Sequence, residues 1–287
     1  MSKIILGTVQ FGLDYGINNN NGKPNNNEIK SILDYAFDNK INFLDTAEAY
    51  GNSHEIIGEY HADSNNKFEV ITKFSKLRLN IPENISERIN YHLNTMNIDS
   101  LYCYMFHDFN DFKQYYKFFK SELLELKNRG VIKKIGVSLH SNNEINNVLK
   151  FKEIELIQLP YNLFDNLSKR GEIFLKAKKS GVEILTRSTF LQGLFFKDLD
   201  TIKGKVSGLK KYLLELNEIV SKEDVNNLAL NYVCSNENID GVLIGVDSVI
   251  QLKNNISCIN NNKFKDILSN IDSLNVKEEN LLNPANW

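Results

Sequence analysis

The chain has 287 residues, of which 42% are hydrophobic and 24% are charged, and its formal net charge at pH 7 is -2. These proportions are ordinary for a globular protein and argue against disorder over the whole chain. The slightly negative charge argues against a nucleic-acid partner, and no apolar run approaches the ~20 residues of a membrane span. The apolar stretch at the N-terminus is too short for a signal-peptide core, so the sequence predicts a cytoplasmic protein without a membrane partner.

The length lies within the range of one αβ barrel, which typically takes about 250 residues. No linker rich in proline, glycine and serine marks a boundary, so we expect residues 1–287 to form a single domain. Cys103, Cys234 and Cys258 are odd in number and far apart, which fits neither a disulfide framework nor a paired zinc-ligand pattern. We expect reduced cysteines, with Cys103 in the core.

Short β-like runs alternate with helix-like segments along the chain, and this alternation predicts a parallel sheet. Eight strands close a (β/α)8 TIM barrel, an α/β fold, and eight candidates are present. The candidate strands are Ile4–Thr8, Asn42–Asp45, Phe68–Lys73, Leu101–His107, Ile132–Ser138, Ile154–Leu159, Val182–Arg187 and Gly241–Val246.

The segments between the strands carry the apolar spacing of helices that pack on a sheet. In the first of them the apolar positions are Ile29, Ile32, Leu33, Ala36 and Phe37. A second helix is predicted over Glu223–Asn236 and an additional one between Gly208 and Val220, which lengthens the connection between the seventh and eighth strands. The asparagine-rich tracts Asn18–Asn21 and Asn25–Asn27 predict a polar loop after the first strand.

Four polar side chains stand at or just after the ends of separate candidate strands. Asp45 ends the second strand, Tyr50 lies in the loop after it, and Lys73 and His107 end the third and fourth. The carboxyl ends of barrel strands meet on one face, where active sites of this fold lie. An acid, a phenol, an amine and an imidazole can together move a proton onto a carbonyl oxygen. We therefore predict a catalytic site formed by Asp45, Tyr50, Lys73 and His107.

Short motifs in a fixed order resemble those of the aldo-keto reductase family over essentially the whole chain. They are Gly7-Thr8, Asp45-Thr46-Ala47 with Tyr50-Gly51, Ile71-Thr72-Lys73, Phe106-His107-Asp108, Gly130 to Ser138, Gln158-Leu159-Pro160-Tyr161-Asn162, and Arg187-Ser188 with Gln192-Gly193. The resemblance implies an NAD(P)H-dependent oxidoreductase that reduces an aldehyde or ketone, with sugar-derived carbonyls among the candidates. The small-molecule carbonyl or alcohol would be the partner of the site.

The resemblance also assigns roles to the four polar residues. Tyr50 would be the general acid, Lys73 and Asp45 would tune it, and His107 would orient the carbonyl. Elementary electrostatics agrees, because an ammonium ~4 Å from a phenol contributes about 4 kcal/mol at an effective dielectric of ~20. That energy is enough to make a phenol a useful acid near neutral pH.

The resemblance implies a set of cofactor contacts at the other strand ends and loops. They are Gly7, Thr8, Ser138, Gln158, Arg187, Ser188, Leu191, Gly193, Gly245, Asp247, Gln251, Asn254 and Asn255. Ser138 and Gln158 would hold the nicotinamide carboxamide, while the Arg187 guanidinium would stack on the ring. The asparagine that follows this serine in the family is replaced by Leu139, with His140 or Asn142 as possible substitutes.

The family favours NADP(H), and many of its members bind the 2′-phosphate through a lysine or arginine near the last strand. This chain has Asp247 there, and Lys253 nearby. A carboxylate beside a phosphate is unfavourable. NAD(H), or dual use, therefore remains an alternative to NADP(H).

A substrate pocket is predicted from aromatic residues on loops and at the tail, namely Phe11, Tyr15, Phe195, Phe196 and Trp287. The short tail predicts an open pocket. His54, His61 and His92 fall on predicted helices and receive no role, and Glu48 and Ala49 are interpreted as spacers.

Two other functions stay open. Asp45 and His107 could be ligands in a metal-dependent hydrolase or isomerase, but Ser138, Gln158 and Arg187 stand where further ligands would be needed, so no metal is expected. A regulatory protein that binds the cofactor with little turnover, as potassium-channel beta subunits of the same family do, is the second alternative. The oligomeric state cannot be predicted from the sequence.

Overall fold

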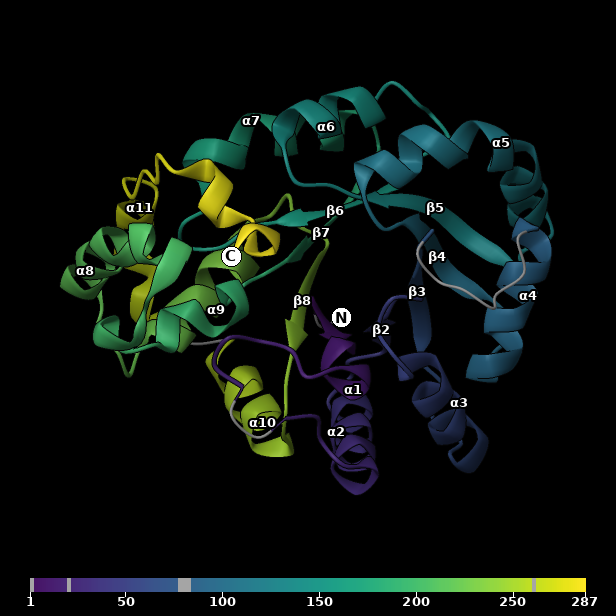
Figure 1. Ribbon diagram of the computed structural model, residues 1–287, viewed down its shortest axis with the longest axis horizontal. Coiled ribbons are helices and arrows are strands. Elements are labelled where there is room, and N and C mark those ends of the chain that lie inside the picture. Colours follow the sequence, from purple (N-terminus) through teal and green to yellow (C-terminus); the bar gives the residue numbers. More distant parts are fainter. Residues whose placement is uncertain (1–2, 20–21, 77–83, 260–261) are drawn as a thin grey trace.

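Eight parallel strands form a closed barrel in chain order, β1 to β8, in a computed structural model that describes residues 3–19, 22–76, 84–259 and 262–287 (Figure 1). The predicted (β/α)8 TIM barrel is therefore confirmed. Part of the first asparagine-rich tract, residues 20 and 21, lies outside the described residues. The strands are β1 (Ile4–Gly7), β2 (Phe43–Asp45), β3 (Glu69–Phe74), β4 (Leu101–Phe106), β5 (Ile132–Ser138), β6 (Leu156–Pro160), β7 (Glu183–Arg187) and β8 (Gly241–Gly245).

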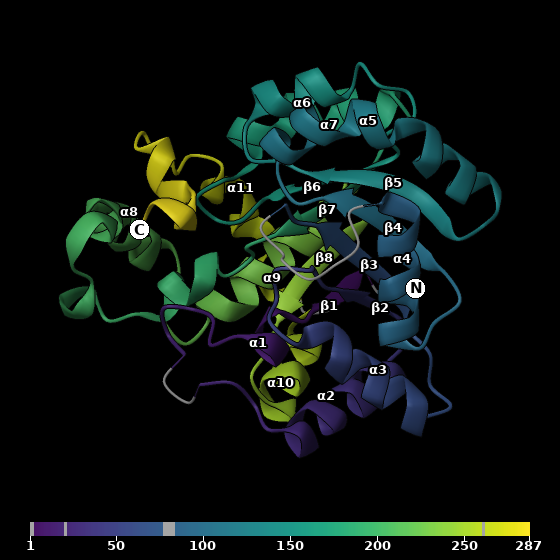
Figure 2. The ribbon, with the colours of Figure 1, turned by 45° about the vertical axis from the view of Figure 1, so that its right-hand side comes forward.

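Helices surround the barrel on its outside (Figures 1 and 2). The α-helices are α1 (Val9–Gly12), α2 (Asn26–Asp38), α3 (Ser53–Asp63), α4 (Ile85–Met96), α5 (Phe109–Asn128), α6 (Asn142–Val148), α7 (Leu167–Lys179), α8 (Lys210–Ile219), α9 (Val225–Ser235), α10 (Val249–Cys258) and α11 (Leu268–Ile271). Short 3-10 helices are η1 (Leu191–Phe196), η2 (Leu199–Thr201), η3 (Gly204–Leu209), η4 (Asn262–Ile267), η5 (Glu279–Leu282) and η6 (Pro284–Asn286). None of the helices in the described segments is long and apolar enough to cross a membrane.

Local sequence explains where these helices begin and which face they bury. Asn25 caps α2 by accepting a hydrogen bond from the Glu28 N–H, and Ser141 and Glu144 form a reciprocal capping box at α6. The predicted apolar face of α2 is buried at Ile29, Ile32, Leu33 and Ala36. The predicted helices before β8 are present as α8 and α9.

The core has two parts, one inside the barrel and one between the barrel and the helices. The interior cluster consists of Ile5, Ile71, Cys103, Met105, Leu156, Leu185 and Leu243. Cys103 is fully buried there, as predicted. Because the apolar cluster fills the barrel interior, polar side chains from the strand ends collect above it, at the carboxyl face.

Strand register sets these polar residues at a common level. Gly7 of β1 lies opposite Asp45 of β2 and Gly245 of β8, and Ser138 of β5 lies opposite Gln158 of β6. The long β7–β8 connection, which holds η1 to η3, α8 and α9, stands beside this face together with the C-terminal segment (Figure 1).

Candidate active site

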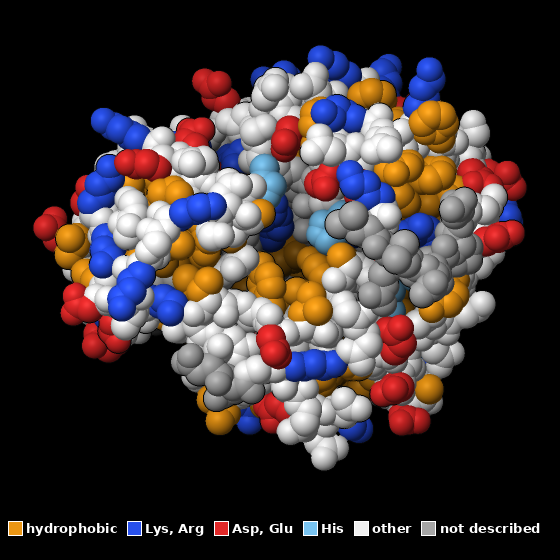
Figure 3. Space-filling model, in the orientation of Figure 1, with side chains coloured by type: hydrophobic (Ala, Val, Ile, Leu, Met, Phe, Trp, Pro, Cys, Tyr) orange, Lys and Arg blue, Asp and Glu red, His pale blue; other side chains and the backbone are white. Residues whose placement is uncertain are grey.

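A cavity of about 760 Å³ opens at the carboxyl ends of the strands. Figure 3 shows it as a hollow whose wall carries blue and pale blue side chains, which are Lys or Arg and His. The predicted catalytic residues Asp45, Tyr50, Lys73 and His107 all line it. Every predicted cofactor-binding residue lines it as well, except Leu191, whose side chain is fully buried outside the cavity wall.

Lys73 and Asp45 form a buried ion pair at the base of the cavity. Lys73 Nζ donates to Asp45 Oδ1 at 2.5 Å and to the Thr46 carbonyl at 2.9 Å. Burial by itself would lower the pKa of Lys73, but the Asp45 carboxylate and, to a lesser extent, the neighbouring Tyr50 hydroxyl outweigh it, so the pKa lies above its ordinary value. Lys73 is therefore a permanent cation at neutral pH.

Asp45 uses both carboxylate oxygens within the protein. Its Oδ2 accepts a hydrogen bond from Gln158 Nε2 at 2.8 Å, while Oδ1 is held by Lys73. Nitrogen donors on both oxygens, one of them cationic, leave this carboxylate poorly suited to a cation. The geometry argues against the alternative in which Asp45 is a metal ligand.

Tyr50 is a neighbour of both Lys73 and His107. The Lys73 ammonium is 5.2 Å from the centre of the Tyr50 ring, and the ring centres of Tyr50 and His107 are 5.8 Å apart in an edge-on arrangement. Burial, reinforced by the charges of Lys73 and Arg187, lowers the pKa of His107 to about 4. A phenol beside a cation and a neutral imidazole that can donate a hydrogen bond therefore face the same space.

The main chain of the Tyr50 loop is packed directly against the turn that follows β1. A Cβ at Gly12 would lie 1.8 Å from the Tyr50 carbonyl oxygen, and one at Gly51 would lie 2.3 Å from the Gly12 carbonyl oxygen. Gly51 also has φ +56, a conformation that favours glycine. Two glycines thus permit a close contact that fixes the backbone of Tyr50.

Glu48 is the centre of a buried polar network, so its interpretation as a spacer is not supported. Its Oε1 accepts hydrogen bonds from Arg88 Nε at 2.9 Å, His92 at 2.8 Å and the Tyr104 hydroxyl at 2.9 Å, and its Oε2 accepts from the Ser75 N–H at 2.8 Å. Burial opposes ionisation, but Arg88 and His92 outweigh it and lower the pKa of Glu48 to about 2. The network joins the Tyr50 loop to β3, α4 and β4.

The three histidines without an assigned role lie on helices, as predicted. His92 of α4 belongs to the Glu48 network. His54 of α3 contacts Thr72 Oγ1 at 2.8 Å, and His61 of α3 contacts the Met96 carbonyl at 2.9 Å. These contacts give all three a structural role.

The nicotinamide end of the predicted cofactor site is formed by β5, β6 and β7. Leu139, which replaces the family's asparagine, is buried and does not line the cavity. Of its two suggested substitutes, His140 lines the cavity and accepts a hydrogen bond from Arg187 Nη2 at 2.8 Å. Asn142 does not line it, and its side chain bonds Arg170 and the Lys169 carbonyl, each at 2.7 Å. His140 is thus the better placed substitute.

The opposite end of the cavity holds buried polar atoms that the described residues leave without partners. These are Gln10 Oε1 and Asp247 Oδ1. Gln10 lies over Gly245, where a Cβ would come within 2.4 Å of Gln10 Oε1. Buried polar atoms are usually paired, so polar groups of a ligand are expected here. This end, where the resemblance predicts the adenosine contacts, therefore has room for polar groups of a ligand.

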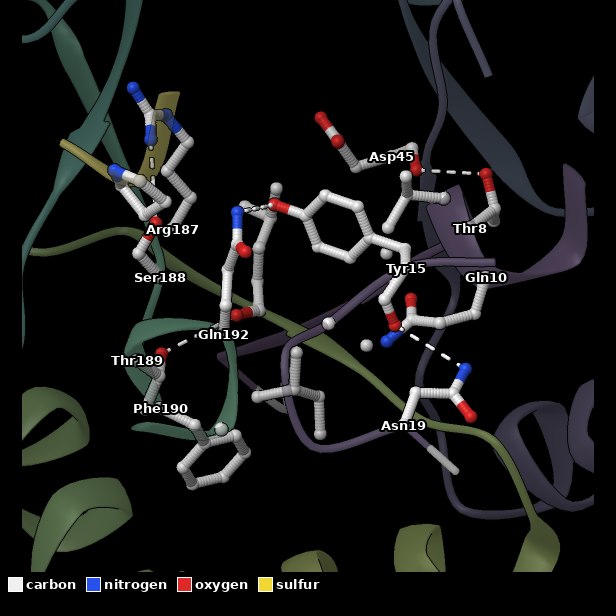
Figure 4. A pocket seen from close by; sticks show the side chains of 18 of the residues that line it. Thr8, Gln10, Tyr15, Asn19, Asp45, Arg187, Ser188, Thr189, Phe190 and Gln192 are labelled. Atoms are coloured by element: carbon white, nitrogen blue, oxygen red, sulfur yellow. Dashed lines mark hydrogen bonds between the residues drawn. The ribbon is translucent and has the colours of Figure 1, made fainter. Parts of the chain in front are cut away.

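Two loops meet over the cavity between these ends. The Tyr15 hydroxyl accepts a hydrogen bond from Gln192 Nε2 at 2.8 Å, and the Ile17 N–H donates to the Gln192 carbonyl at 3.2 Å (Figure 4). Gly193 packs so closely that an added Cβ would lie 2.9 Å from Asn18 Cβ. The loop after β1 and η1 after β7 are therefore joined across the cavity.

The predicted aromatic lining is partly wrong. Tyr15 and Phe196 line the cavity, but Phe11 and Phe195 belong to the hydrophobic core. Trp287 packs against the core and donates Nε1 to the Leu281 carbonyl at 2.8 Å. The cavity is also lined by Phe190, which the sequence did not single out, and by Asn283, Pro284 and Ala285 of the short tail.

Comparison with known proteins gives the same family from the sequence. The model of the aldo/keto reductase family matches residues 3–276. An uncharacterized oxidoreductase of Bacillus subtilis is 26% identical over 262 residues, which cover 82% of this chain and 83% of that protein. An NADH-specific methylglyoxal reductase of Escherichia coli is 25% identical over 280 residues, which cover 83% of each.

Solved structures with the same fold are also found. An aldo-keto reductase from Bacillus halodurans, in its holo form, has a TM-score of 0.77 at 20% identity and covers 97% of this chain and 95% of its own. A glycerol dehydrogenase from Gluconobacter oxydans has a TM-score of 0.70 at 20% identity. The superposition covers 96% of this chain and 93% of that one. At these identities the superpositions show a shared fold.

Proposed function

The chain belongs to the aldo/keto reductase family and is an oxidoreductase, and we propose that it reduces an aldehyde or ketone to an alcohol with Tyr50 as the general acid. The observation that carries the proposal is the position of Lys73, which bonds Asp45 and lies 5.2 Å from the centre of the Tyr50 ring. This arrangement places a permanent cation beside a phenol in a cavity large enough for a cofactor and a small substrate.

A nicotinamide cofactor bound in the cavity would supply the hydride. Tyr50 gives its phenolic proton to the carbonyl oxygen, and the Lys73 ammonium stabilises the phenolate that remains. Asp45 holds the ammonium in position. His107, neutral because burial lowers its pKa to about 4, donates a hydrogen bond that orients the carbonyl.

Residues at both ends of the cavity would hold the cofactor. Ser138 and Gln158 suit the carboxamide of the nicotinamide, and Gln158 would exchange or share its bond to Asp45. Ser188 and Gly193 would border the pyrophosphate. Gly245, Asp247, Gln251, Asn254 and Asn255 would surround the adenosine.

We infer NAD(H) as the preferred cofactor, although the family resemblance favours NADP(H). Asp247 lines the adenosine end with an unpartnered buried oxygen. Lys253 does not line the cavity, and its ammonium lies 5.1 Å from the Tyr35 ring centre. A carboxylate that forms no ion pair with any described residue suits a ribose hydroxyl and disfavours a 2′-phosphate. The E. coli relative, named as NADH-specific, supports this inference.

Fluorescence titration of the purified protein with NADH and NADPH tests the preference. The expected result is at least tenfold tighter binding of NADH, and Asp247→Ser should narrow the difference. Tighter binding of NADPH by the unaltered protein would contradict the inference and restore the family expectation.

Cofactor oxidation over a panel of aldehydes and ketones tests the reaction. We expect oxidation that depends on the added carbonyl compound. Cofactor binding with no substrate-dependent oxidation across the panel would instead favour the regulatory alternative.

A further inference from the structure

Arg187 at the end of β7 stands on the cavity wall with neutral partners. Its Nη2 donates to His140 Nε2 at 2.8 Å and to the Leu139 carbonyl at 3.5 Å, and its Nη1 donates to Ser188 Oγ at 3.3 Å. Within the described part of the chain, no carboxylate forms an ion pair with it. These bonds use three of the five guanidinium N–H donors, which leaves two for a ligand.

His140 does not offset or share the charge of Arg187. Its Nε2 accepts the hydrogen bond, so that nitrogen carries no proton. Burial first, and then the charges of Arg187 and Arg170, lower the pKa of His140 to about 3. The pair is therefore a cation beside a neutral ring throughout the physiological range.

The neighbouring carboxylates are engaged elsewhere. Asp45 is held by Lys73 and Gln158. Asp165 is held by Arg170, whose Nε and Nη2 each donate to it at 2.7 Å. Asp108 lies at the cavity rim, where its exposed side chain caps α5. Lys73 and Arg170 thus each pair with a carboxylate, whereas Arg187 is a cation of the reacting end that none of the described carboxylates contacts.

The Arg187 guanidinium is close enough to His107 to act on it electrostatically. Arg187 contributes, after burial and Lys73, to the lowered pKa of His107. Burial also lowers the pKa of Arg187 itself, which indicates a desolvated cation. Such a charge is costly unless an anion completes its shell. In Figure 4, Arg187 and Ser188 stand across the cavity from Asp45 and Thr8.

We propose that Arg187 binds an anionic group of the carbonyl substrate, a carboxylate or a phosphate. The inference rests on the proposed carbonyl reduction and names its substrate class. A planar guanidinium pairs with either oxyanion through parallel hydrogen bonds. The preferred substrates are therefore aldehydes or ketones that carry a negative charge.

Matched substrate pairs, each differing in the anionic group, test the proposal with NADH. D-glyceraldehyde 3-phosphate is compared with D-glyceraldehyde for the phosphate, and succinic semialdehyde with butanal for the carboxylate. In at least one pair the kcat/KM ratio of anionic to neutral substrate should be ten or more, and Arg187→Gln should reduce that ratio at least tenfold. Arg187→Lys keeps the positive charge and should therefore retain part of the preference for the anionic substrate.

The ratio separates substrate recognition from other roles of Arg187. Loss of a cofactor contact, or of support for Tyr50, lowers both members of a pair equally and leaves the ratio unchanged, which would overturn the proposal. A preference for the neutral member in both pairs would overturn it as well. Arg129→Gln, at an exposed arginine at the end of α5, is the matched control and should leave the ratios as they are.

Binding measurements keep the proposal testable if no carbonyl compound is turned over, a result that would count against the proposed function alone. Calorimetry of the NADH complex with succinic semialdehyde and with D-glyceraldehyde 3-phosphate then replaces kinetics. Binding that Arg187→Gln weakens tenfold or more supports the anion subsite. Equal binding in the two proteins, or no binding of either compound, overturns it.

Discussion

The Tyr15 hydroxyl and the Gln192 amide, 177 positions apart, meet at 2.8 Å over the cavity. Their bond joins the loop after β1 to η1, and both loops border the space that we assign to the cofactor. A bound dinucleotide would therefore lie beneath this contact, and its release would require the two loops to part.

Removal of the Tyr15 hydroxyl should speed cofactor release. A single hydrogen bond contributes about 0.5–1.5 kcal/mol, so Tyr15→Phe should raise the dissociation rate of NADH about two- to tenfold. Stopped-flow displacement of the bound cofactor measures the rate. Tyr91→Phe, at an exposed tyrosine of α4, is the control, and an unchanged rate in Tyr15→Phe would show that the contact does not restrain the cofactor.

Tyr50→Phe should abolish most of the turnover without weakening the binding of NADH. Positioned acid catalysis contributes about 10²–10⁴-fold, so kcat should fall by that factor while the dissociation constant of NADH stays within about twofold. Single-turnover kinetics and fluorescence titration give the two quantities. Full carbonyl-reducing activity in this variant would falsify the role of Tyr50 as the acid.

Lys73 and Asp45 should show strong energetic coupling. Lys73→Met leaves a buried carboxylate without its cation, which costs about 3–5 kcal/mol of unfolding free energy. Adding Asp45→Asn to that variant should restore a large part of the loss, because the uncompensated charge is removed. Urea denaturation of the single and double variants measures the coupling, and strictly additive losses would argue against the buried pair.

Stability should fall as pH drops from about 6.5 toward 4. The pKa values of His107 and His140 are lowered from 6.5 to about 4 and about 3, so in this range the unfolded chain binds protons that the folded protein does not. Since the unfolded state then takes up more protons, the free energy of unfolding decreases as pH falls. Urea midpoints at pH 7 and pH 5 measure the loss, and His107→Asn with His140→Asn should reduce it.

The Glu48 network should make the free energy of unfolding depend on pH in a separate, more acidic pH range. The pKa of Glu48 is lowered from 4.5 to about 2, so its stabilisation is complete above pH 4.5 and is lost as pH falls toward 2. At pH 7, Glu48→Gln should cost about 3–5 kcal/mol because Arg88 loses a buried counter-ion. Glu59→Gln, at an exposed position of α3, should change the midpoint little.

The barrel and the cavity floor could be predicted because the strands are short, largely apolar runs, and several of them carry a polar residue at or near the carboxyl end, as β2 does with Asp45 and β5 with Ser138. An error of one residue in a strand boundary did not change which residues reach the cavity. His107 was predicted to end the fourth strand; it follows β4, which ends at Phe106, and it lines the cavity. Contacts between distant segments could not be predicted in this way. Glu48 has its partners 27 to 56 positions away, and nothing local distinguishes its neighbourhood from a solvated turn.

Whether an aromatic residue on a loop lines the cavity or joins the core also depends on contacts between distant segments, so it was harder to predict from the sequence. Phe11 and Phe196 have similar local settings, yet Phe11 turns into the core and Phe196 faces the cavity. The direction of a loop side chain depends on what packs behind it. Here α1, which contains Phe11, is pressed against the Tyr50 loop.

The contact between Gly12 and Gly51 limits how this enzyme can evolve. Because main chain meets main chain there, with no side chains to adjust, a substitution at either position would displace the backbone that sets Tyr50 together with the turn that leads to Tyr15. The loop of the proposed acid and the loop that contains Tyr15 are thus linked through the main chain. Other lining residues, such as Phe190, Phe196 and the tail residues Asn283 to Ala285, take no part in this main-chain contact, so we expect substitutions there to alter the cavity without displacing Tyr50.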